Sequence, residues 1–397
     1  MSSGLIDLNE DLKKLRSKGY NIDIHNGHLV VRDIPYVCND GSVKVDGMLV
    51  TELELSGDRT IAPSRHQIRF IGQCPCDRNS NKMDSVRPNE QRFKISAVLE
   101  TDFELSNKPP GGYKDYYEKI TNYTSLISGP ASTIDPSTSP MTNRVVEPGE
   151  DESPFNYLDT ASTRAEIGMI SEKLAVNKVA IVGLGGSGSY VLDLIAKTPV
   201  KEIHLFDGDK FNSHNAFRAP GAASVDELRK QPLKVEYFKG IYEKMHRGII
   251  AHPEFISEAN VDQLLEMNCV FLCVDAGPGK RTVVETLAPT EVPFIDASMG
   301  LIEHNESLRG IIAVRASTSN NRDEAKDKMN LDDTDEANEY ERNIQVADLN
   351  ALAAQLAVMR WKKMRGFYTD RNGYNYYTYT IASGRLDLEP SKDNNDE

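Results

Sequence analysis

The stretch VAIVGLGGSGSYVLDLIAKTPVKEIHLFDGD, residues 179–209, has the pattern of a strand, a glycine turn, a helix and a second strand. Four glycines lie in the turn: Gly183, Gly185, Gly186 and Gly188. Three of them satisfy the G-x-G-x-x-G pattern of dinucleotide-binding folds, and Asp207 ends the next apolar run, where a ribose-binding carboxylate is expected. Such a turn lets backbone N–H groups approach phosphate oxygens at a helix N-terminus. The stretch predicts a nucleotide site, and both NAD and ATP fit it.

Outward from this stretch, strand patterns alternate with helix patterns. The apolar strand runs are 178–184, 202–207, 269–276 and 293–298, and the helix patterns between them are 188–198, 225–247 and 279–288. Then follow a strand at 307–317, an acidic segment at 322–342, a helix at 343–365 and an aromatic strand at 374–386. Alternation of this kind predicts an α/β fold, with a Rossmann-like, doubly wound, mostly parallel sheet.

A smaller α+β domain is expected before this fold. Its pattern is a helix at 8–19, strands at 28–37, 47–55, 66–72 and 93–105, and a helix at 113–129. Residues 130–156 are rich in Pro, Ser, Thr and acidic residues, which is typical of a linker. We expect four parts: an α+β domain at 1–140, a linker at 141–158, the α/β domain at 159–388 and a disordered tail at 389–397.

Composition limits the class of protein. The chain has 397 residues and a formal charge of −14, and an acidic chain is a poor non-specific binder of nucleic acid. We see no signal-peptide layout and no apolar run long enough for a membrane span, so we expect no membrane partner. Five cysteines, an odd number, argue against a disulfide framework and favour a reducing, cytoplasmic setting.

The residues after Asp207 favour ATP over NAD. Asp209, Asn215 and Arg218 follow within one short segment, and Lys234 lies further on. A nicotinamide site needs no further cations beside its pyrophosphate, whereas a triphosphate with a leaving pyrophosphate does need them. Asp275 ends the strand at 269–276, on the ligand edge of an open α/β sheet, where a carboxylate suits Mg²⁺.

In combination these motifs resemble the adenylyltransferase superfamily of ubiquitin-activating E1 enzymes, ThiF and MoeB. The shared features are a G-x-G-G-x-G loop, then D-x-D, an S-N-x-x-R motif, a lysine and a strand-end aspartate, over about residues 160–385. The resemblance implies the following roles: ATP phosphates at the four glycines, ribose at Asp207, phosphates at Asn215, Arg218 and Lys234, and Mg²⁺ at Asp275. It further implies an arginine donated to the partner subunit's site, for which Arg164 is the candidate.

Two features depart from the family pattern. The usual S-N is SHN here, and the stretch between Arg218 and Lys234 is long enough that Lys230 rivals Lys234 for the lysine role.

The resemblance also implies the reaction and the partners. The C-terminal carboxylate of a ubiquitin-like protein attacks the α-phosphate of ATP, which gives an acyl-adenylate and pyrophosphate in a bacterial conjugation pathway. The acidic segment 322–342 occupies the place of the family's crossover loop, which lies over the substrate tail. We expect a homodimer, and an E2-like protein as a further partner.

The cysteines leave the later steps open. Cys269 and Cys273 lie in an apolar strand and fit a core role. Cys38, Cys74 and Cys76 lie in the first domain, where the QCPCD segment fits a thioester nucleophile, half of a metal site with His66, or a structural turn. If no thioester forms on this chain, the adenylate passes directly to a partner's thiol.

Residues 1–140 resemble an uncharacterised N-terminal domain of bacterial ThiF-like proteins, on the strength of GYNIDIHNGHLVVRDIPYV and GGYKDYYEKITNY. We expect this domain to recognise the ubiquitin-like protein or an E2-like partner. Three alternatives remain for the whole chain: an adenylating enzyme for a sulfur carrier or a small carboxylate, a catalytically silent nucleotide-binding scaffold, and an NAD-dependent oxidoreductase.

Overall fold

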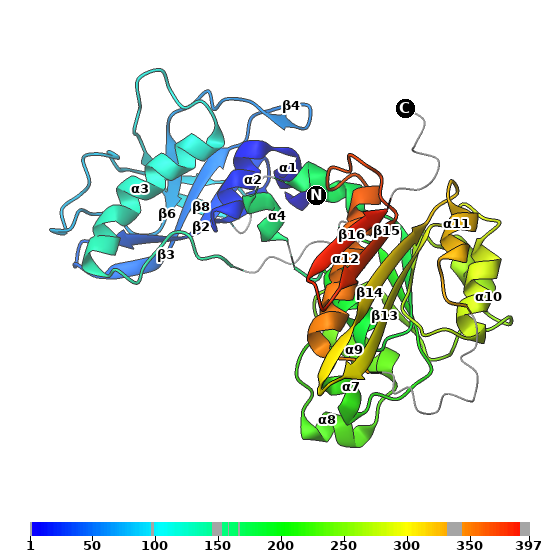
Figure 1. Ribbon diagram of the computed structural model, residues 1–397. Helices are drawn as coiled ribbons and strands as arrows, with labels where there is room; N and C mark the ends of the chain where they lie inside the picture. The colour runs from blue at the N-terminus through cyan, green and yellow to red at the C-terminus, as the bar shows by residue number, and fades with distance from the viewer. Residues whose placement is uncertain are drawn as a thin grey trace. The chain divides into compact units, whose positions relative to one another are not determined.

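A computed structural model describes residues 2–96, 99–144, 153–157, 159–165, 167–331 and 344–389 (Figure 1). The chain divides into two compact units. Unit 1 comprises Met1–Glu152 and Tyr157–Ile167, and unit 2 comprises Ser153–Asn156 and Gly168–Glu397. Over the described residues, no helix is both long enough and apolar enough to cross a membrane.

Unit 1 is an antiparallel sheet with a long helix packed on it. The sheet has the order β1-β2-β3-β6-β8-β7, and β4 and β5 form a separate short hairpin. The strands are β1 (Asn21–His25), β2 (His28–Val37), β3 (Val43–Glu52), β4 (Leu55–Ser56), β5 (Arg59–Thr60), β6 (Ile68–Ile71), β7 (Asn89–Lys94) and β8 (Glu100–Leu105). The helices are α1 (Ser2–Leu8), α2 (Glu10–Ser17), α3 (Tyr116–Ile134) and α4 (Thr160–Arg164). Tyr116, Ile120 and Tyr123 of α3 join the core with strand residues, which fixes the helix against the sheet.

Several predicted boundaries in unit 1 were wrong. The single strand expected at 93–105 is two antiparallel strands, β7 and β8. The helix expected at 8–19 is α1 and α2, separated at Asn9, whose carboxamide donates to Leu5 O. Helix α3 runs through Pro130 to Ile134, so the first residues of the Pro-, Ser- and Thr-rich segment 130–156 are helical.

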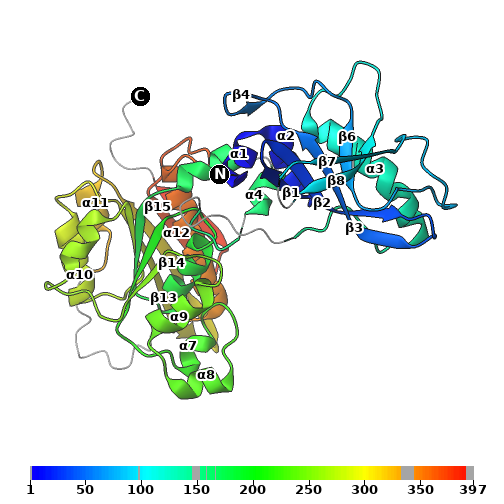
Figure 2. The same cartoon turned by 180° about the vertical axis from the view of Figure 1, so that it is seen from behind.

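Unit 2 is built on a mixed sheet of eight strands in the order β11-β10-β9-β12-β13-β14-β15-β16. Strands β13 and β14 lie side by side in it (Figure 2). The strands are β9 (Lys178–Val182), β10 (Glu202–Phe206), β11 (Ile249–His252), β12 (Cys269–Leu272), β13 (Phe294–His304), β14 (Ser307–Ser317), β15 (Tyr376–Thr380) and β16 (Arg385–Glu389). The first five in sheet order are parallel, and β14, β15 and β16 extend the sheet antiparallel. The predicted α/β class with a mostly parallel sheet is confirmed.

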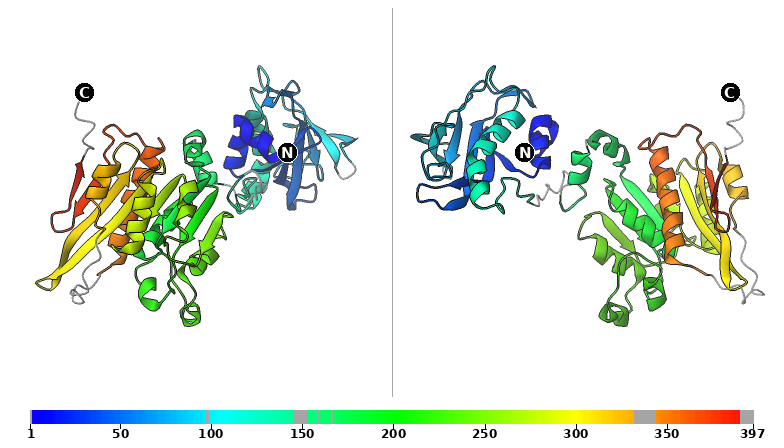
Figure 3. Two further views of the ribbon diagram at one scale, coloured as in Figure 1. Left: turned by 90° about the vertical axis from the view of Figure 1, so that its right-hand side faces the viewer. Right: turned by 60° about the vertical axis from the view of Figure 1, so that its left-hand side comes forward.

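Helices cover both faces of this sheet (Figure 3). They are α5 (Gly168–Ser171), α6 (Gly186–Ile195), α7 (Ser213–Ala216), α8 (Val225–Lys230), α9 (Lys234–Tyr242), α10 (Pro278–Leu287), α11 (Arg322–Asp327) and α12 (Ala347–Met364), with 3-10 turns η1 (Glu172–Leu174) and η2 (Val261–Glu266). One core cluster joins α6, α9 and α12 to the sheet and includes Trp361, and a second joins α10, η2 and α11 to it. The two layers leave the carboxyl ends of the parallel strands as one edge.

Three predictions in unit 2 were wrong in detail. The helix expected at 225–247 is α8 and α9, because Gln231 adopts a left-handed conformation and Pro232 follows it. The aromatic strand expected at 374–386 is the hairpin β15–β16. The acidic segment expected to be a loop begins with helix α11, and its residues 332–342 lie outside the described residues, as does the tail after Glu389.

Candidate functional site

The glycine turn begins where β9 ends, and its shape depends on close backbone contacts. Gly183 has φ +88°, and its N–H donates to Phe206 O at 2.8 Å. A Cβ at Gly183 would lie 2.6 Å from Cys273 O, and one at Gly188 would lie 1.8 Å from Gly183 O. Side chains at both positions are therefore excluded, and the turn folds tightly onto β12 and the start of α6.

The other two glycines face different surroundings. Gly185 is the residue before α6, and a Cβ there would meet nothing within 4 Å. Gly186 starts α6, and a Cβ there would lie 2.0 Å from Asn350 Nδ2. The fourth glycine of the motif therefore leaves room for the Asn350 side chain of α12, a long-range contact that the local pattern did not reveal.

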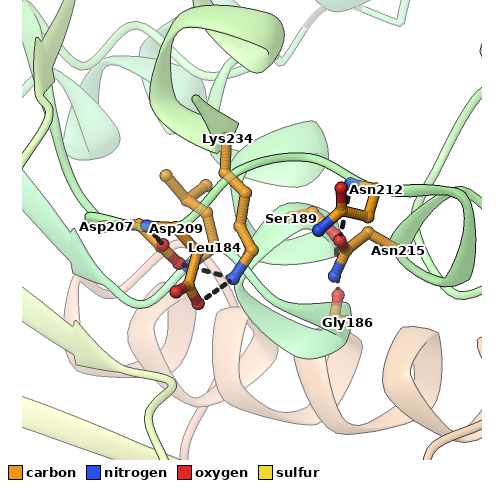
Figure 4. A network of polar contacts seen from close by, with 8 residues as sticks. All are labelled: Leu184, Gly186, Ser189, Asp207, Asp209, Asn212, Asn215 and Lys234. Atoms are coloured by element: carbon orange, nitrogen blue, oxygen red, sulfur yellow. Dashed lines mark hydrogen bonds and ion pairs between the residues drawn. The ribbon is translucent and has the colours of Figure 1, made fainter. Parts of the chain in front are cut away.

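Asp207 is held in place by the turn itself. Its Oδ2 accepts the Leu184 N–H at 2.7 Å, and its Oδ1 accepts the Asp209 N–H at 2.8 Å. The Lys234 ammonium lies 3.3 Å from Asp207 Oδ2 and 2.7 Å from Asp209 Oδ2, so it bridges the two carboxylates (Figure 4). Asp207 is 5% exposed, whereas the Asp209 side chain is 58% exposed. The predicted D-x-D motif and the predicted lysine therefore form one cluster.

Of the two predicted phosphate ligands Arg218 and Asn215, the structure brings only Arg218 to the site. Arg218 lines a cavity at the turn, and its Nε is buried without a hydrogen-bond partner in the described structure. An unpartnered buried donor on a guanidinium is costly, which favours an acceptor supplied by a ligand. Asn215 is buried, and its Oδ1 accepts the Asn212 N–H at 2.9 Å, so its carboxamide caps α7 and is not among the lining residues.

The cavity at the turn has a volume of about 450 Å³. Eight predicted residues line it: Gly183, Gly185, Gly186, Asp207, Asp209, Arg218, Lys234 and Asp275. Gly188 is not among the lining residues, but its close approach to Gly183 O keeps the turn tight. Lys230 is exposed at the end of α8 and does not line the cavity. Arg164 ends α4 in unit 1, and its side chain lies outside the described structure.

A second charged cluster on the cavity was missed by the sequence analysis. Lys280 Nζ lies 2.6 Å from Asp296 Oδ1, and Arg315 Nη1 lies 3.0 Å from Asp296 Oδ2. Arg315 Nη1 also donates to Ser298 Oγ at 2.8 Å. Lys280, Ser298 and Arg315 line the cavity. The signal was present only as isolated charges far apart in the sequence: the pairing of β13 with β14 brings Asp296 and Arg315 together, and helix α10 brings Lys280 to them.

Aromatic side chains lie at the Asp207 side of the cavity. Phe206 and Phe255 both line it, and the Phe255 side chain is 63% exposed above Gly208. On β11, the His252 ring stacks on Phe206 with a centroid separation of 4.2 Å. An exposed aromatic face beside a ribose-type carboxylate is a suitable surface for a nucleobase.

A magnesium ion fits the donors present. Asp275 is an exposed carboxylate on the cavity, at the carboxyl side of β12. In the parts of the chain that are described, no group of three or more His, Cys, Asp or Glu side chains could hold a metal unaided. Mg²⁺ is commonly held by one or two carboxylates together with phosphate oxygens and water, so the Asp275 carboxylate suits a metal that arrives with a nucleotide.

The cysteines show no sign of activation. Cys38 and Cys76 are buried, and burial raises the pKa of Cys74 and of Cys76, which lowers the thiolate fraction at neutral pH. Burial also raises the pKa of Cys269 and of Cys273 to about 12. Cys269 lies in the core as expected, whereas Cys273 is half-buried and lines the cavity. His66 pairs with Ser106 Oγ at 3.2 Å and joins no metal-binding group within the described ranges.

Comparison with known families agrees with this geometry. Residues 162–356 match the ThiF family. This part of the chain is a ThiF family domain. Residues 10–160 match a domain of unknown function, DUF6791, which precedes it. The predicted family resemblance is therefore confirmed at the level of domains, and the mostly parallel sheet with helices expected of a ThiF domain is the one observed in unit 2.

Similar solved structures include PaaA and the E. coli protein MccB. The PaaA structure is 17% identical with a TM-score of 0.43, covering 56% of this chain and 66% of that chain. MccB with ATP is 19% identical with a TM-score of 0.44, covering 56% and 66%. MccB with AMPCPP and MccA is 18% identical with a TM-score of 0.46, covering 62% and 74%. The chain thus spans just under two thirds of the first of these, and no curated protein matches it.

Proposed function

We propose that the chain is an E1-like adenylyltransferase. It uses ATP and Mg²⁺ to adenylate the C-terminal carboxylate of a ubiquitin-like protein, for conjugation in a bacterial pathway. The observation that carries the proposal is that one cavity at the glycine turn, which three carboxylates also line, gathers four cationic side chains, in a chain of formal charge −14. They are Arg218, Lys234, Lys280 and Arg315. A triphosphate needs such charge, whereas a nicotinamide dinucleotide does not.

The described contacts suggest how each group acts on ATP. The N–H groups at the start of α6 point toward the phosphates, with the positive end of the helix dipole behind them. Asp207, already fixed by two backbone N–H groups, accepts from the ribose hydroxyls. Arg218 supplies its unpartnered Nε to a phosphate oxygen, and Lys234 turns from Asp209 toward the same group.

The reaction needs positioning and charge neutralisation more than proton transfer. A carboxylate oxygen forms a bond to the α-phosphorus, the bond from that phosphorus to the pyrophosphate oxygen breaks, and pyrophosphate leaves with the electron pair. Bound Mg²⁺, held by Asp275 and phosphate oxygens, would neutralise charge on the triphosphate. The chain's own task is to bring the two anions together and to exclude water.

A polypeptide tail is a suitable second substrate because the cavity opens along a sheet face. Gly300, Ile311 and Ala313 line it on β13 and β14. Ile302, which follows on the same face of β13, is 46% exposed, and Ile311 is 43% exposed. An extended chain fits such a strip better than a compact small molecule does. The expected crossover loop falls largely at 332–342, outside the described residues.

We further propose a homodimer, with an E2-like protein as the acceptor of the adenylate. Phe217, next to Arg218, is 86% exposed, and Met169 is 85% exposed. Large apolar side chains this exposed support a surface of unit 2 that a second subunit covers. Arg164 remains the proposed arginine for the partner subunit's site. Unit 1 is proposed to recognise the ubiquitin-like protein or the E2-like protein. The five free cysteines fit a cytoplasmic setting.

ATP–pyrophosphate exchange tests the proposal. The chain is incubated with Mg-ATP, labelled pyrophosphate and a panel of ubiquitin-fold proteins, together with a pool of random hexapeptides. We expect exchange with free C-terminal carboxylates and none with the same proteins and peptides bearing C-terminal amides. Arg218→Gln should lower the exchange rate about tenfold or more, since a charge-assisted contact to phosphate is lost. No exchange with any member would support a silent scaffold instead, and exchange with small carboxylates alone would support the small-carboxylate alternative.

A further inference from the structure

The cluster of Lys280, Asp296 and Arg315 carries more positive than negative charge. Asp296 is fully buried, the Lys280 side chain is 3% exposed and the Arg315 side chain is 20% exposed. Asp296 therefore compensates one of the two cations that contact it. The other positive charge remains in the cavity wall, where the low dielectric of the surroundings strengthens its attraction for an anion.

Arg315 keeps donors available for that anion. Its hydrogen bonds to Asp296 Oδ2 and Ser298 Oγ both come from Nη1. Within the described ranges, Nη2 and Nε donate to no protein acceptor. A guanidinium is planar and rigid, so a guanidinium pinned by one nitrogen presents its remaining donors in a fixed direction. This arrangement suits a planar anion with two oxygens.

The position of Arg315 in the sheet separates it from the nucleotide's cations. In the order β10-β9-β12-β13-β14, Asp207 follows β10 and Asp275 follows β12, whereas Arg315 lies on β14. With strands about 4.8 Å apart, β14 lies roughly 14 Å from β9, where the glycine turn begins. Arg218 and Lys234 serve the Asp207 side. The β13–β14 side, beyond Asp275, is left for the second substrate.

We propose that Arg315, held by Asp296 and Ser298 and backed by Lys280, binds the carboxylate that attacks ATP. This rests on the proposed function of the same cavity and names the group that the second substrate must present, a free terminal carboxylate. Two N–H donors on one carboxylate orient it and offset its repulsion from the triphosphate. Arg315 keeps its charge throughout, and the only bonds that change are those at the α-phosphorus described above.

Fluorine NMR with difluoroacetate as a minimal carboxylate tests the inference without turnover. The whole chain is titrated in a buffer free of other carboxylates, with and without AMPCPP and Mg²⁺. We expect the difluoroacetate line to broaden and shift on binding, and the line of 2,2-difluoroacetamide, which has no charge, to stay unchanged. Arg315→Gln keeps a donor for Asp296 and Ser298 but loses the charge, and should weaken difluoroacetate binding about tenfold.

Two further variants make the result specific. Arg309→Gln is the matched control, because Arg309 lies exposed on the same strand and outside the cavity lining. It should leave difluoroacetate binding unchanged. Arg315→Lys retains the ion pair to Asp296 but lacks the guanidinium donors Nη2 and Nε that would bind the carboxylate. Its affinity for difluoroacetate should lie between those of wild type and Arg315→Gln, and it provides a test even if Arg315→Gln folds poorly.

The outcomes separate this inference from the proposed function. Calorimetric titration with AMPCPP in parallel reports on the nucleotide site. Wild-type protein that binds AMPCPP but not difluoroacetate would overturn the carboxylate role alone. Equal difluoroacetate binding by Arg315→Gln and wild type would overturn it too, as would a loss of AMPCPP affinity in Arg315→Gln comparable to the loss of difluoroacetate affinity. Failure of wild type to bind AMPCPP would instead count against the proposed function.

Discussion

Gly188 and Gly185 stand three residues apart in one turn, yet a methyl group would meet very different surroundings at each. At Gly188 it would lie 1.8 Å from the backbone oxygen of Gly183, and at Gly185 it would meet nothing within 4 Å. Backbone oxygen cannot move aside as a flexible side chain can. The turn and the start of α6 must therefore shift if Gly188 is replaced.

Gly188→Ala should accordingly lower the free energy of unfolding of unit 2 by about 3 kcal/mol. Gly185→Ala is the matched control and should leave it unchanged. The chain has one tryptophan, Trp361, which is 1% exposed in the core of unit 2, so its fluorescence during urea unfolding measures this unit. Equal unfolding midpoints for the two variants would contradict the described turn.

Lys119 gives unit 1 an unusual dependence on pH. It is fully buried, and its ammonium donates to Thr51 Oγ1 at 2.8 Å and Arg65 O at 2.9 Å. Burial lowers the pKa of Lys119 to about 8, against 10.5 for a free lysine. Between these values the unfolded chain binds the proton and the folded chain does not, so stability rises with pH over that interval.

We predict that unit 1 gains roughly 2 kcal/mol between about pH 8 and pH 9.5. Lys119→Met should remove the gain. Hydrogen exchange of α3 amides, compared between the two proteins at each pH so that intrinsic exchange rates cancel, measures it. Working below pH 10 avoids the buried tyrosines, since burial raises the pKa of Tyr36 and of Tyr116 to about 12 and their effect on stability starts only above the unfolded value. A wild-type curve parallel to that of Lys119→Met would contradict this account.

At the scale of elements, single residues determine where helix α8 starts and where it ends. Helix α8 is started by Ser224, whose Oγ accepts the Glu227 N–H at 3.2 Å, and ended by Gln231 with φ +46°. Pro232 then prevents α8 from continuing into α9. The turn matters to the site because Lys234, the first residue of α9, is placed by it.

Gln231→Gly should stabilise unit 2 by about 1 kcal/mol, because glycine adopts the left-handed conformation without the clash of a Cβ. Gln231→Ala keeps the Cβ and should show no such gain. Trp361 fluorescence during urea unfolding compares the two. A glycine variant less stable than the alanine variant would show that Gln231 does not strain the turn.

Much of each element could be predicted from the sequence, and the exceptions have physical causes. Strand β14 was expected at its observed bounds because the apolar residues Ile311–Val314 form its centre. The hairpin β15–β16 was missed because strand-forming residues stand on both sides of the turn Ile381–Gly384. So short a turn does not interrupt the strand pattern of the sequence. Helix α11 was missed because its acidic surface residues resemble a solvated loop, while its burial rests on Ala325 alone within the helix.

At the scale of the whole molecule, the candidate site was predictable where its residues follow one another in sequence. The glycine turn, Asp207, Asp209, Arg218 and Lys234 lie in one part of unit 2, and their motifs, together with the family resemblance, predicted one shared site; the structure brings them to one cavity. Lys280, Asp296 and Arg315 were not foreseen, because their meeting depends on α10 and on the antiparallel pairing of β13 with β14. Asn350 was missed for the same reason, since α12 brings it to the turn.

The central claim is that this cavity holds Mg-ATP. Calorimetric titration of the chain with AMPCPP in the presence of Mg²⁺, and separately with NAD, tests it most directly. We predict one AMPCPP bound per chain and no binding of NAD. Lys234→Gln should weaken AMPCPP binding about tenfold, while Lys230→Gln, on the exposed end of α8, should leave it unchanged. Binding of NAD in preference to AMPCPP, or equal AMPCPP affinity in the two variants, would contradict the account.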